Sequence, residues 1–88
     1  MKVNLCRHVT HSAFPDGSAV LLDGKAGRYW QLNETGNLML KHLLSGQSAT
    51  ETARLMGSEL PVSPAQLEHD LAILITQLES ANLVRRKK

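Results

Sequence analysis

The stretch of sequence that decides the fold runs from Leu21 to Gly36 and reads LLDGKAGRYWQLNETG. Its pattern predicts a short apolar strand, a glycine-containing turn, a returning strand and the cap of a helix. The chain has one Phe, one Tyr and one Trp, and two of these, Tyr29 and Trp30, are adjacent on the returning strand. This concentration of aromatic side chains marks the returning strand as the first place to look for a binding function.

The composition indicates one small intracellular domain. A chain of 88 residues with 42% hydrophobic residues can bury a modest core. The single cysteine, Cys6, excludes an internal disulfide and favours a reducing, cytoplasmic setting. No apolar run approaches the roughly 20 residues of a membrane span, and the N-terminus lacks the apolar segment of a secretory signal. We therefore expect a cytoplasmic protein without a membrane partner.

Positive charge is concentrated at the C-terminus. The net charge is +2, but residues 85–88 are all Arg or Lys, which leaves residues 1–84 at −2. Leu83 and Val84 form a short apolar return before this basic segment. We expect a single domain over residues 1–84 and a solvated, frayed basic tail over residues 85–88. Attraction of an acidic partner by the tail is the alternative interpretation.

Three short strands are expected before the first helix. Val3, Leu5, His8 and Val9 fit a first strand or an irregular β segment. Residues 15–18 (PDGS) predict a turn, because proline presets φ and glycine accepts the left-handed conformation. Residues 19–23 and 28–32 then form a hairpin. If consecutive strands are neighbours, residues 28–32 lie at one edge of a three-stranded antiparallel sheet.

Three helices follow the strands. A side chain suited to helix capping precedes each one: Asn33, Ser48 and Ser63. Glu51 completes a capping box with the second cap. Gly46 and Gly57 end the first two helices, and the third runs to about Ser80. A sheet followed by three helices predicts an α+β fold that resembles a winged helix-turn-helix with its sheet placed first, an architecture typical of nucleic-acid or peptide binding.

The third helix is poorly suited to DNA. A recognition helix needs Arg, Lys, Asn or Gln at base edges and phosphates. Its polar positions include Glu68, Asp70 and Glu79 and no Lys or Arg, and phosphate repels acids. We expect no nucleic-acid partner, and DNA binding remains an alternative chiefly through the basic tail.

Metal binding and catalysis have weak support. Cys6, His8 and His11 spell C-x-H-x-x-H, and on a strand Cys6 and His8 would share a face. Zinc requires four ligands, and no fourth is evident nearby. A cysteine–histidine pair also lacks the glycine-rich turn of an oxyanion hole. We therefore expect a buried thiol, surface imidazoles, no metal, no cofactor and no enzymatic activity.

An apolar stripe runs along the third predicted helix, formed by Leu67, Leu71, Leu74 and Leu78. Such a stripe ordinarily packs into the core. Ala72, Ile73 and Ile75 widen it beyond the sector that a small core requires. One flank of this helix should therefore remain uncovered, and an uncovered apolar flank usually marks a partner site.

The edge strand and this helix together suggest a peptide groove. Unpaired backbone groups at a sheet edge can accept an extended peptide as an added strand. Tyr29 and Trp30 would lie on opposite faces of the edge strand, and the third helix would form the opposite wall. The plainer alternative is that one aromatic packs on the core and the other lies on the surface.

Residues 22–36 resemble the signature of the PqqD-like family: an apolar strand, Asp, a glycine-containing turn, an aromatic pair and Leu-Asn-x-Thr-Gly opening a helix. The resemblance extends over about residues 3–84. Its most specific part is Leu-Asn-Glu-Thr-Gly at residues 32–36, whereas the helical remainder is generic.

The resemblance implies a non-catalytic recognition element for ribosomally made, modified peptides, which binds the leader of a precursor peptide and presents its core to processing enzymes. A small free-standing chain of this kind looks most like the leader-binding protein of split lasso-peptide systems. The implied partners are then a leader peptidase of the cysteine protease class and an ATP-dependent macrolactam cyclase. A PqqD-type chaperone for the pyrroloquinoline quinone precursor, with a radical enzyme as partner, is the alternative.

The resemblance also implies where the leader binds, on the edge hairpin and the third helix. The implied peptide-binding residues are Leu22, Arg28, Tyr29, Trp30, Gln31, Leu67, Asp70, Leu71 and Leu74. Asp70 could pair with Arg28 across the groove or accept a hydrogen bond from a leader side chain such as a Tyr hydroxyl. The plain alternative for Asp70 is a solvated acid on a helix.

Overall fold

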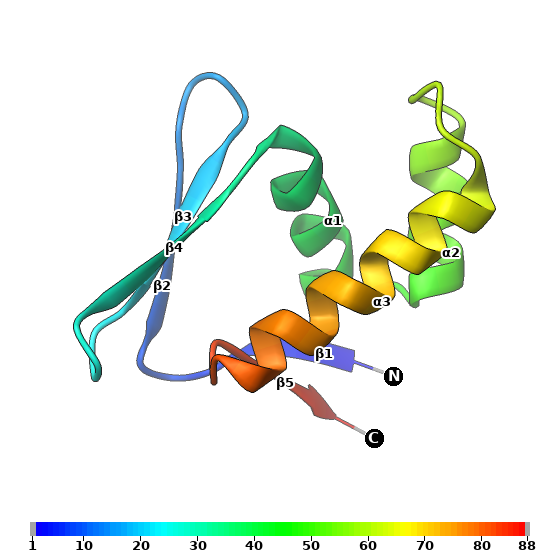
Figure 1. Cartoon of the computed structure of the whole chain (residues 1–88). Coiled ribbons are helices and arrows are strands. Elements are labelled where there is room, and N and C mark those ends of the chain that lie inside the picture. The colour runs from blue at the N-terminus through cyan, green and yellow to red at the C-terminus, as the bar shows by residue number, and fades with distance from the viewer. Residues whose placement is uncertain (1, 88) are drawn as a thin grey trace.

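Three helices and two antiparallel sheets make up the structure, a computed structural model that describes residues 2–87. The three-stranded sheet stands on one side, the helices lie on the other, and the chain ends lie near each other beside the two-stranded ribbon (Figure 1). The α+β class predicted from the sequence is confirmed. The elements are β1 (Lys2–Leu5), β2 (Val9–Ala13), β3 (Ala19–Asp23), β4 (Arg28–Leu32), α1 (Glu34–Leu44), α2 (Ala49–Gly57), α3 (Pro64–Ser80) and β5 (Val84–Lys87).

The larger sheet is a meander in the order β2-β3-β4, so β4 is an edge strand as predicted. Its register sets Leu21 opposite Trp30 and Leu22 opposite Tyr29. The β3–β4 turn is held by the carboxylate of Asp23, whose Oδ1 accepts hydrogen bonds from two turn amides at 3.0 Å each. Gly27 completes this turn with a φ of 69°, a conformation that costs glycine little.

The first strand or irregular β segment expected over residues 3–9 is not one element, because its residues divide between two strands in two sheets. β1 ends at Leu5, and a turn closed by Val9 N–H donating to Cys6 O at 3.0 Å separates it from β2. β1 instead pairs with β5. The ribbon buries Val3 and Val84 to 2% and 3% exposure, so it adds apolar cover to the core at the end of the helices. That gain comes from a pairing distant in sequence, which local patterning does not reveal.

The expectation of a frayed tail is also wrong for residues 85–87, since they belong to β5. The ladder sets Asn4 opposite Arg85 and Val3 opposite Arg86. Arg86 Nε donates to Glu79 Oε1 of α3 at 2.8 Å, which ties the strand to the helix before it. The last residue of the predicted tail, Lys88, lies outside the described residues.

All three predicted helix caps are present. Asn33, Ser48 and Ser63 each accept a hydrogen bond from the backbone amide three residues later. Only half of the predicted capping box forms, because the Glu51 carboxylate accepts hydrogen bonds from Arg54 at 2.6 and 3.2 Å. The helix starts are therefore set by short-range chemistry, as expected.

The core lies where α1, α2 and α3 meet the inner face of the meander and the β1–β5 ribbon. Ile75 is 2% exposed, so the prediction that it widens the uncovered flank of α3 is wrong. Leu74, expected in the core stripe, is only half-buried. The buried stripe is rotated because α3 packs on α2 and also contacts β5. The largest fully buried apolar side chains are Leu21, Leu40, Leu43, Met56, Leu67, Leu71 and Leu78.

Among the described helices, none combines the length and apolar character needed to cross a membrane.

Candidate functional site

The free edge of β4 forms one side of the candidate site. Its side chains alternate, and the two adjacent aromatics point to opposite faces, as predicted. Trp30 is half-buried and packs against the core, whereas Tyr29 is 71% exposed on the outer face. Leu22, opposite Tyr29 in the ladder, is also exposed. Arg28 and Gln31 are exposed as well, so β4 offers polar and aromatic side chains beside a backbone edge that no other strand of residues 2–87 pairs with.

Helix α3 forms the opposite side. Ile73 is 43% exposed and Ala72 is exposed, which confirms the prediction of an uncovered apolar flank. Leu74 lies half-buried at the border of that flank. Leu67 and Leu71, also predicted to bind peptide, are at most 1% exposed and belong to the core. They support the helix from beneath and present no surface in this structure.

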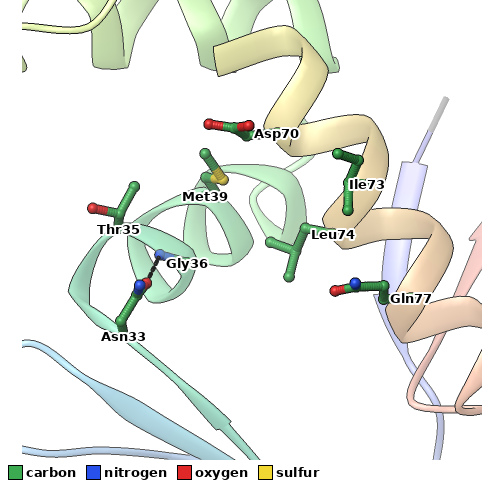
Figure 2. Close-up of a pocket in the computed structure, with 8 residues that line it drawn as sticks. All are labelled: Asn33, Thr35, Gly36, Met39, Asp70, Ile73, Leu74 and Gln77. Carbon is green, nitrogen blue, oxygen red and sulfur yellow. Dashed lines mark hydrogen bonds between the residues drawn. The ribbon is translucent and has the colours of Figure 1, made fainter. Parts of the chain in front are cut away.

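A hollow of about 280 Å³ lies between α3 and the start of α1. Figure 2 shows the two helices presenting side chains to it from opposite sides. It is lined by the α1 cap Asn33, by Thr35, Gly36 and Met39 of α1, and by Asp70, Ile73, Leu74 and Gln77 of α3. Sequence reasoning missed the α1 residues, although the Leu-Asn-Glu-Thr-Gly segment that contains three of them was its most specific motif.

The structure explains why a glycine stands at position 36 of this motif. Its amide donates to Asn33 Oδ1 at 2.8 Å, the capping hydrogen bond drawn in Figure 2. A Cβ added at this glycine would lie 3.2 Å from the same oxygen and 3.5 Å from Leu32 Cδ2. Glycine therefore keeps the cap tight, the start of α1 close to β4, and this wall of the hollow free of a side chain.

Asp70 is hydrogen-bonded to Gln66 and not to Arg28. Its Oδ1 accepts a hydrogen bond from Gln66 Nε2 at 2.9 Å, one turn earlier on α3. Among the ion pairs of residues 2–87, none joins Asp70 to Arg28. In the β3–β4 ladder, Arg28 lies opposite Asp23. The carboxylate of Asp70 lines the hollow and is half-buried, so it is placed to accept a further donor.

The cysteine and histidines near the N-terminus are structural in this arrangement. Cys6 lies in the turn after β1 and is half-buried, so it is neither on a strand nor fully buried. The two imidazoles are partly exposed and hydrogen-bonded: His8 Nε2 lies 3.0 Å from Asn82 O, and His11 Nε2 lies 2.8 Å from Asn37 Oδ1. Within the described part of the chain, no three His, Cys, Asp or Glu side chains are grouped closely enough to hold a metal ion.

Comparisons with known proteins identify a family and two similar solved structures. Residues 18–84 match the family described as "Coenzyme PQQ synthesis protein D (PqqD)". A search of curated proteins finds no significant match. A solved lasso peptide synthetase B1, complexed with the leader peptide, is 34% identical with a TM-score of 0.90 and covers 98% of this chain and 100% of its own.

A second solved structure, TbiB1 in complex with the TbiA(beta) leader peptide, has a TM-score of 0.85 and 24% identity. It covers 100% of this chain and 99% of its own. At that identity, the likeness supports the fold alone.

Proposed function

Since this chain belongs to the PqqD family, we propose that it recognises the leader region of a ribosomally made precursor peptide. The observation that carries the proposal is that the structure combines an edge strand, β4, with an open hollow between α3 and the start of α1. Further support comes from the 34% identical lasso peptide synthetase B1, which was solved with a leader peptide. We place this chain in the lasso-peptide branch of the family.

The leader binds as an added strand. Main-chain hydrogen bonds to the open edge of β4 supply affinity that depends little on leader sequence. Trp30 supplies an apolar surface on the inner side of that strand, and Tyr29 and Gln31 contact it from the outer side. Helix α3 forms the opposite wall through Leu74 and Asp70. A leader of about five residues matches the length of β4, since a strand advances about 3.3 Å per residue.

The hollow between α1 and α3 fixes the register of the leader. Met39, Ile73 and Leu74 provide an apolar lining, and Asp70 and Thr35 provide polar atoms beside it. This combination suits a leader side chain with an apolar body and a terminal hydroxyl, such as tyrosine. Its ring would fill the hollow, and its hydroxyl would donate to the Asp70 carboxylate. A one-residue slip of the added strand would turn this side chain to the other face.

The protein acts by tethering and performs no chemistry itself. Holding the leader raises the effective concentration of the attached core peptide at the enzymes that process it. In the lasso-peptide setting these are a cysteine protease that removes the leader and an ATP-dependent cyclase that closes the macrolactam. We propose that this exchange takes place in the cytoplasm, without a cofactor bound to this chain.

A PqqD-type role is the second candidate, because the matching family carries that description. In that case the bound peptide is the pyrroloquinoline quinone precursor and the partner is a radical enzyme. Both candidates use the same groove. They are separated by comparing the affinities for a lasso-peptide leader and for the quinone precursor.

We also propose that the fold is a winged helix-turn-helix with its sheet first. Support comes from the packing of α2 on α3 across the short connection over residues 58–63. In this protein the arrangement serves peptide binding, because α3 offers its apolar flank and its acid to the groove.

The experiment that tests the proposal is a titration of Trp30 fluorescence with a synthetic leader from the precursor encoded beside this gene. Trp30 is the chain's single tryptophan and lies on the proposed strand. We expect a saturable change at 1:1 stoichiometry, and no change with a scrambled leader of equal composition. An unresponsive tryptophan, together with salt-dependent binding of random duplex DNA, would instead support the DNA-binding alternative.

A further inference from the structure

His8 lies in the turn between β1 and β2 and contacts residues next to both sides of the proposed leader site. Its Nε2 is 3.0 Å from the backbone oxygen of Asn82, in the turn that follows α3. The same atom is 3.7 Å from Asp23 Oδ1, at the end of β3. Its backbone oxygen accepts a hydrogen bond from the Gly24 amide at 2.8 Å. One residue therefore connects the β3–β4 turn to the end of α3.

These contacts lie at one end of the groove. Asp23 is paired with Arg28 in the ladder, so it stands beside the first residue of β4. Asn82 comes two residues after α3 ends and has a φ of 60°, a left-handed conformation that asparagine tolerates better than most residues. In Figure 1 the β1–β2 connection passes between the β3–β4 turn and the C-terminal end of α3.

The opposite end of the groove is joined differently. There β4 continues through Asn33 directly into α1, and α1 shares the hollow with α3. Asn37 of α1, only 4% exposed, also donates to Gly17 O at 2.8 Å and lies 2.8 Å from His11 Nε2. That end is held by a continuous chain and a part-buried polar network around Asn37. The Arg28 end has no such chain connection to α3. There the Cys6 amide donates to Leu83 O at 3.0 Å, and His8 supplies the side-chain link to Asn82.

We propose that His8 is a positioning residue, whose imidazole holds the Arg28 end of β4 at the separation from α3 that the leader strand requires. The inference rests on the proposed function and deepens it. The Asn82 carbonyl can only accept a hydrogen bond, so His8 Nε2 must carry the hydrogen. The nearby Asp23 carboxylate also favours a hydrogen on Nε2. Without this link, some molecules of the free protein have a distance between β4 and α3 that does not admit the leader. The apparent affinity for the leader then falls in proportion to the fraction of molecules that can bind it.

The first arm of the test measures the separation without any leader. Spin labels on Lys25→Cys and Ser80→Cys, in a Cys6→Ser background, report the distance between the β3–β4 turn and the end of α3. We expect a narrow distance distribution with His8, a broader one with His8→Ala, and a narrow one again with His8→Gln, whose amide nitrogen can reach Asn82 O. His8→Asn keeps a polar group but is too short, so it should broaden the distribution even if the alanine variant does not fold.

The second arm measures leader affinity at a temperature where every variant is fully folded, so that a loss of global stability alone leaves binding unchanged. We expect His8→Ala and His8→Asn to weaken binding about fivefold, the scale of one hydrogen bond, and His8→Gln to restore it. His69→Ala is the matched control, because His69 is an exposed histidine on α3 outside this link.

The outcomes separate the two proposals. A wild-type chain that does not bind the leader contradicts the proposed function, whatever the spin labels show. A wild-type chain that binds, with an alanine or asparagine variant that keeps the narrow distribution and the same affinity, overturns the role of His8. If His8→Gln restores neither the narrow distance distribution nor the leader affinity, the proposed role of His8 is also overturned, because the ring itself and not its hydrogen bond would then be required.

Discussion

Trp30 lies directly opposite Leu21 in the β3–β4 ladder, which places its indole on the inner face of the sheet beside a fully buried leucine. Its neighbour Tyr29 lies opposite Leu22 on the outer face, where both side chains are exposed. Two adjacent aromatics thus have different surroundings. Only Trp30 lies on the same side of β4 as the helices and the proposed groove.

The Trp30→Ala variant should weaken leader binding by roughly 1–3 kcal/mol, the range for a buried interface anchor. Tyr29→Ala should cost less, because Tyr29 contacts an added strand only from the outer face. Isothermal titration calorimetry measures both variants without relying on tryptophan emission. Equal affinities for wild type and Trp30→Ala would remove β4 from the binding site.

Leu74→Ala should also weaken leader binding by roughly 1–3 kcal/mol, because it removes apolar lining from the hollow. Val62→Ala is the matched control, since Val62 is an exposed apolar residue before α3 that does not line the hollow. Thermal unfolding of both variants shows whether the half-buried Leu74 also supports the core. If the two variants bind the leader alike, α3 does not form the second wall.

Asp70→Asn tests the charge in the hollow. The amide oxygen of asparagine can still accept from Gln66 Nε2, so the local contact on α3 is kept while the charge is lost. We expect a loss of about 1–2 kcal/mol in leader affinity, because a hydrogen bond to a charged acceptor becomes a neutral one. Glu68→Gln removes the same charge from an exposed position on α3. Similar losses in both variants would indicate long-range electrostatics instead of a contact in the hollow.

Thr52→Val should stabilise the protein. Thr52 of α2 is fully buried, and within residues 2–87 its hydroxyl oxygen has no hydrogen-bond partner. Valine has nearly the same shape and no hydroxyl to desolvate, so we expect the free energy of unfolding to rise by about 1 kcal/mol. Urea unfolding measures the change, and Thr76→Val, at an exposed position of α3, should alter it by less than about 0.5 kcal/mol. A destabilised Thr52→Val would imply that the hydroxyl is satisfied.

Asp23 should contribute to the acid sensitivity of the fold. The Ala26 amide that donates to its carboxylate is the main cause that holds the pKa of Asp23 below its usual value of 3.8, and His8 and Arg28 lower it further. Folding therefore favours the ionised carboxylate. This stabilisation is present above the unfolded-state pKa and is lost as the pH falls through the folded-state pKa.

An Asp23→Asn variant keeps an acceptor for the turn amides but has no carboxylate to protonate. Its free energy of unfolding should fall less steeply than that of the wild type as the pH drops below about 4. Chemical unfolding at a series of pH values provides the comparison. Parallel profiles for the two proteins would show that the turn gains nothing from the charge of Asp23.

The strands of the hairpin and the starts of the helices were predictable, because their chemistry is local. The glycines of the β3–β4 turn and the caps at Asn33, Ser48 and Ser63 act on residues a few positions away. The edge position of β4 followed from the meander order. The uncovered flank of α3 followed from its excess of apolar residues, although which of these residues would be covered did not.

The candidate site was predictable only in part. The edge position of β4 and the uncovered flank of α3 were predicted, but Leu67 and Leu71 proved to be core residues and the α1 lining of the hollow was missed. Helical periodicity gives the width of an apolar face and not its exact rotation, which depends on the elements that pack against it. For this reason Ile75, expected on the uncovered flank, is buried, whereas Leu74, expected in the core, is only half-buried.

The sequence by itself determined the hairpin, the three helices and the aromatic edge strand, since each depends on residues close together in the chain. Only the tertiary structure decided that residues 3–9 divide between two sheets and that residues 85–87 form a strand on β1. The tertiary structure also brought His8 to Asn82 and Asp70 to the start of α1. Contacts of this kind join residues far apart in sequence, and they form because folding must bury the remaining apolar surface and satisfy the polar groups that come with it.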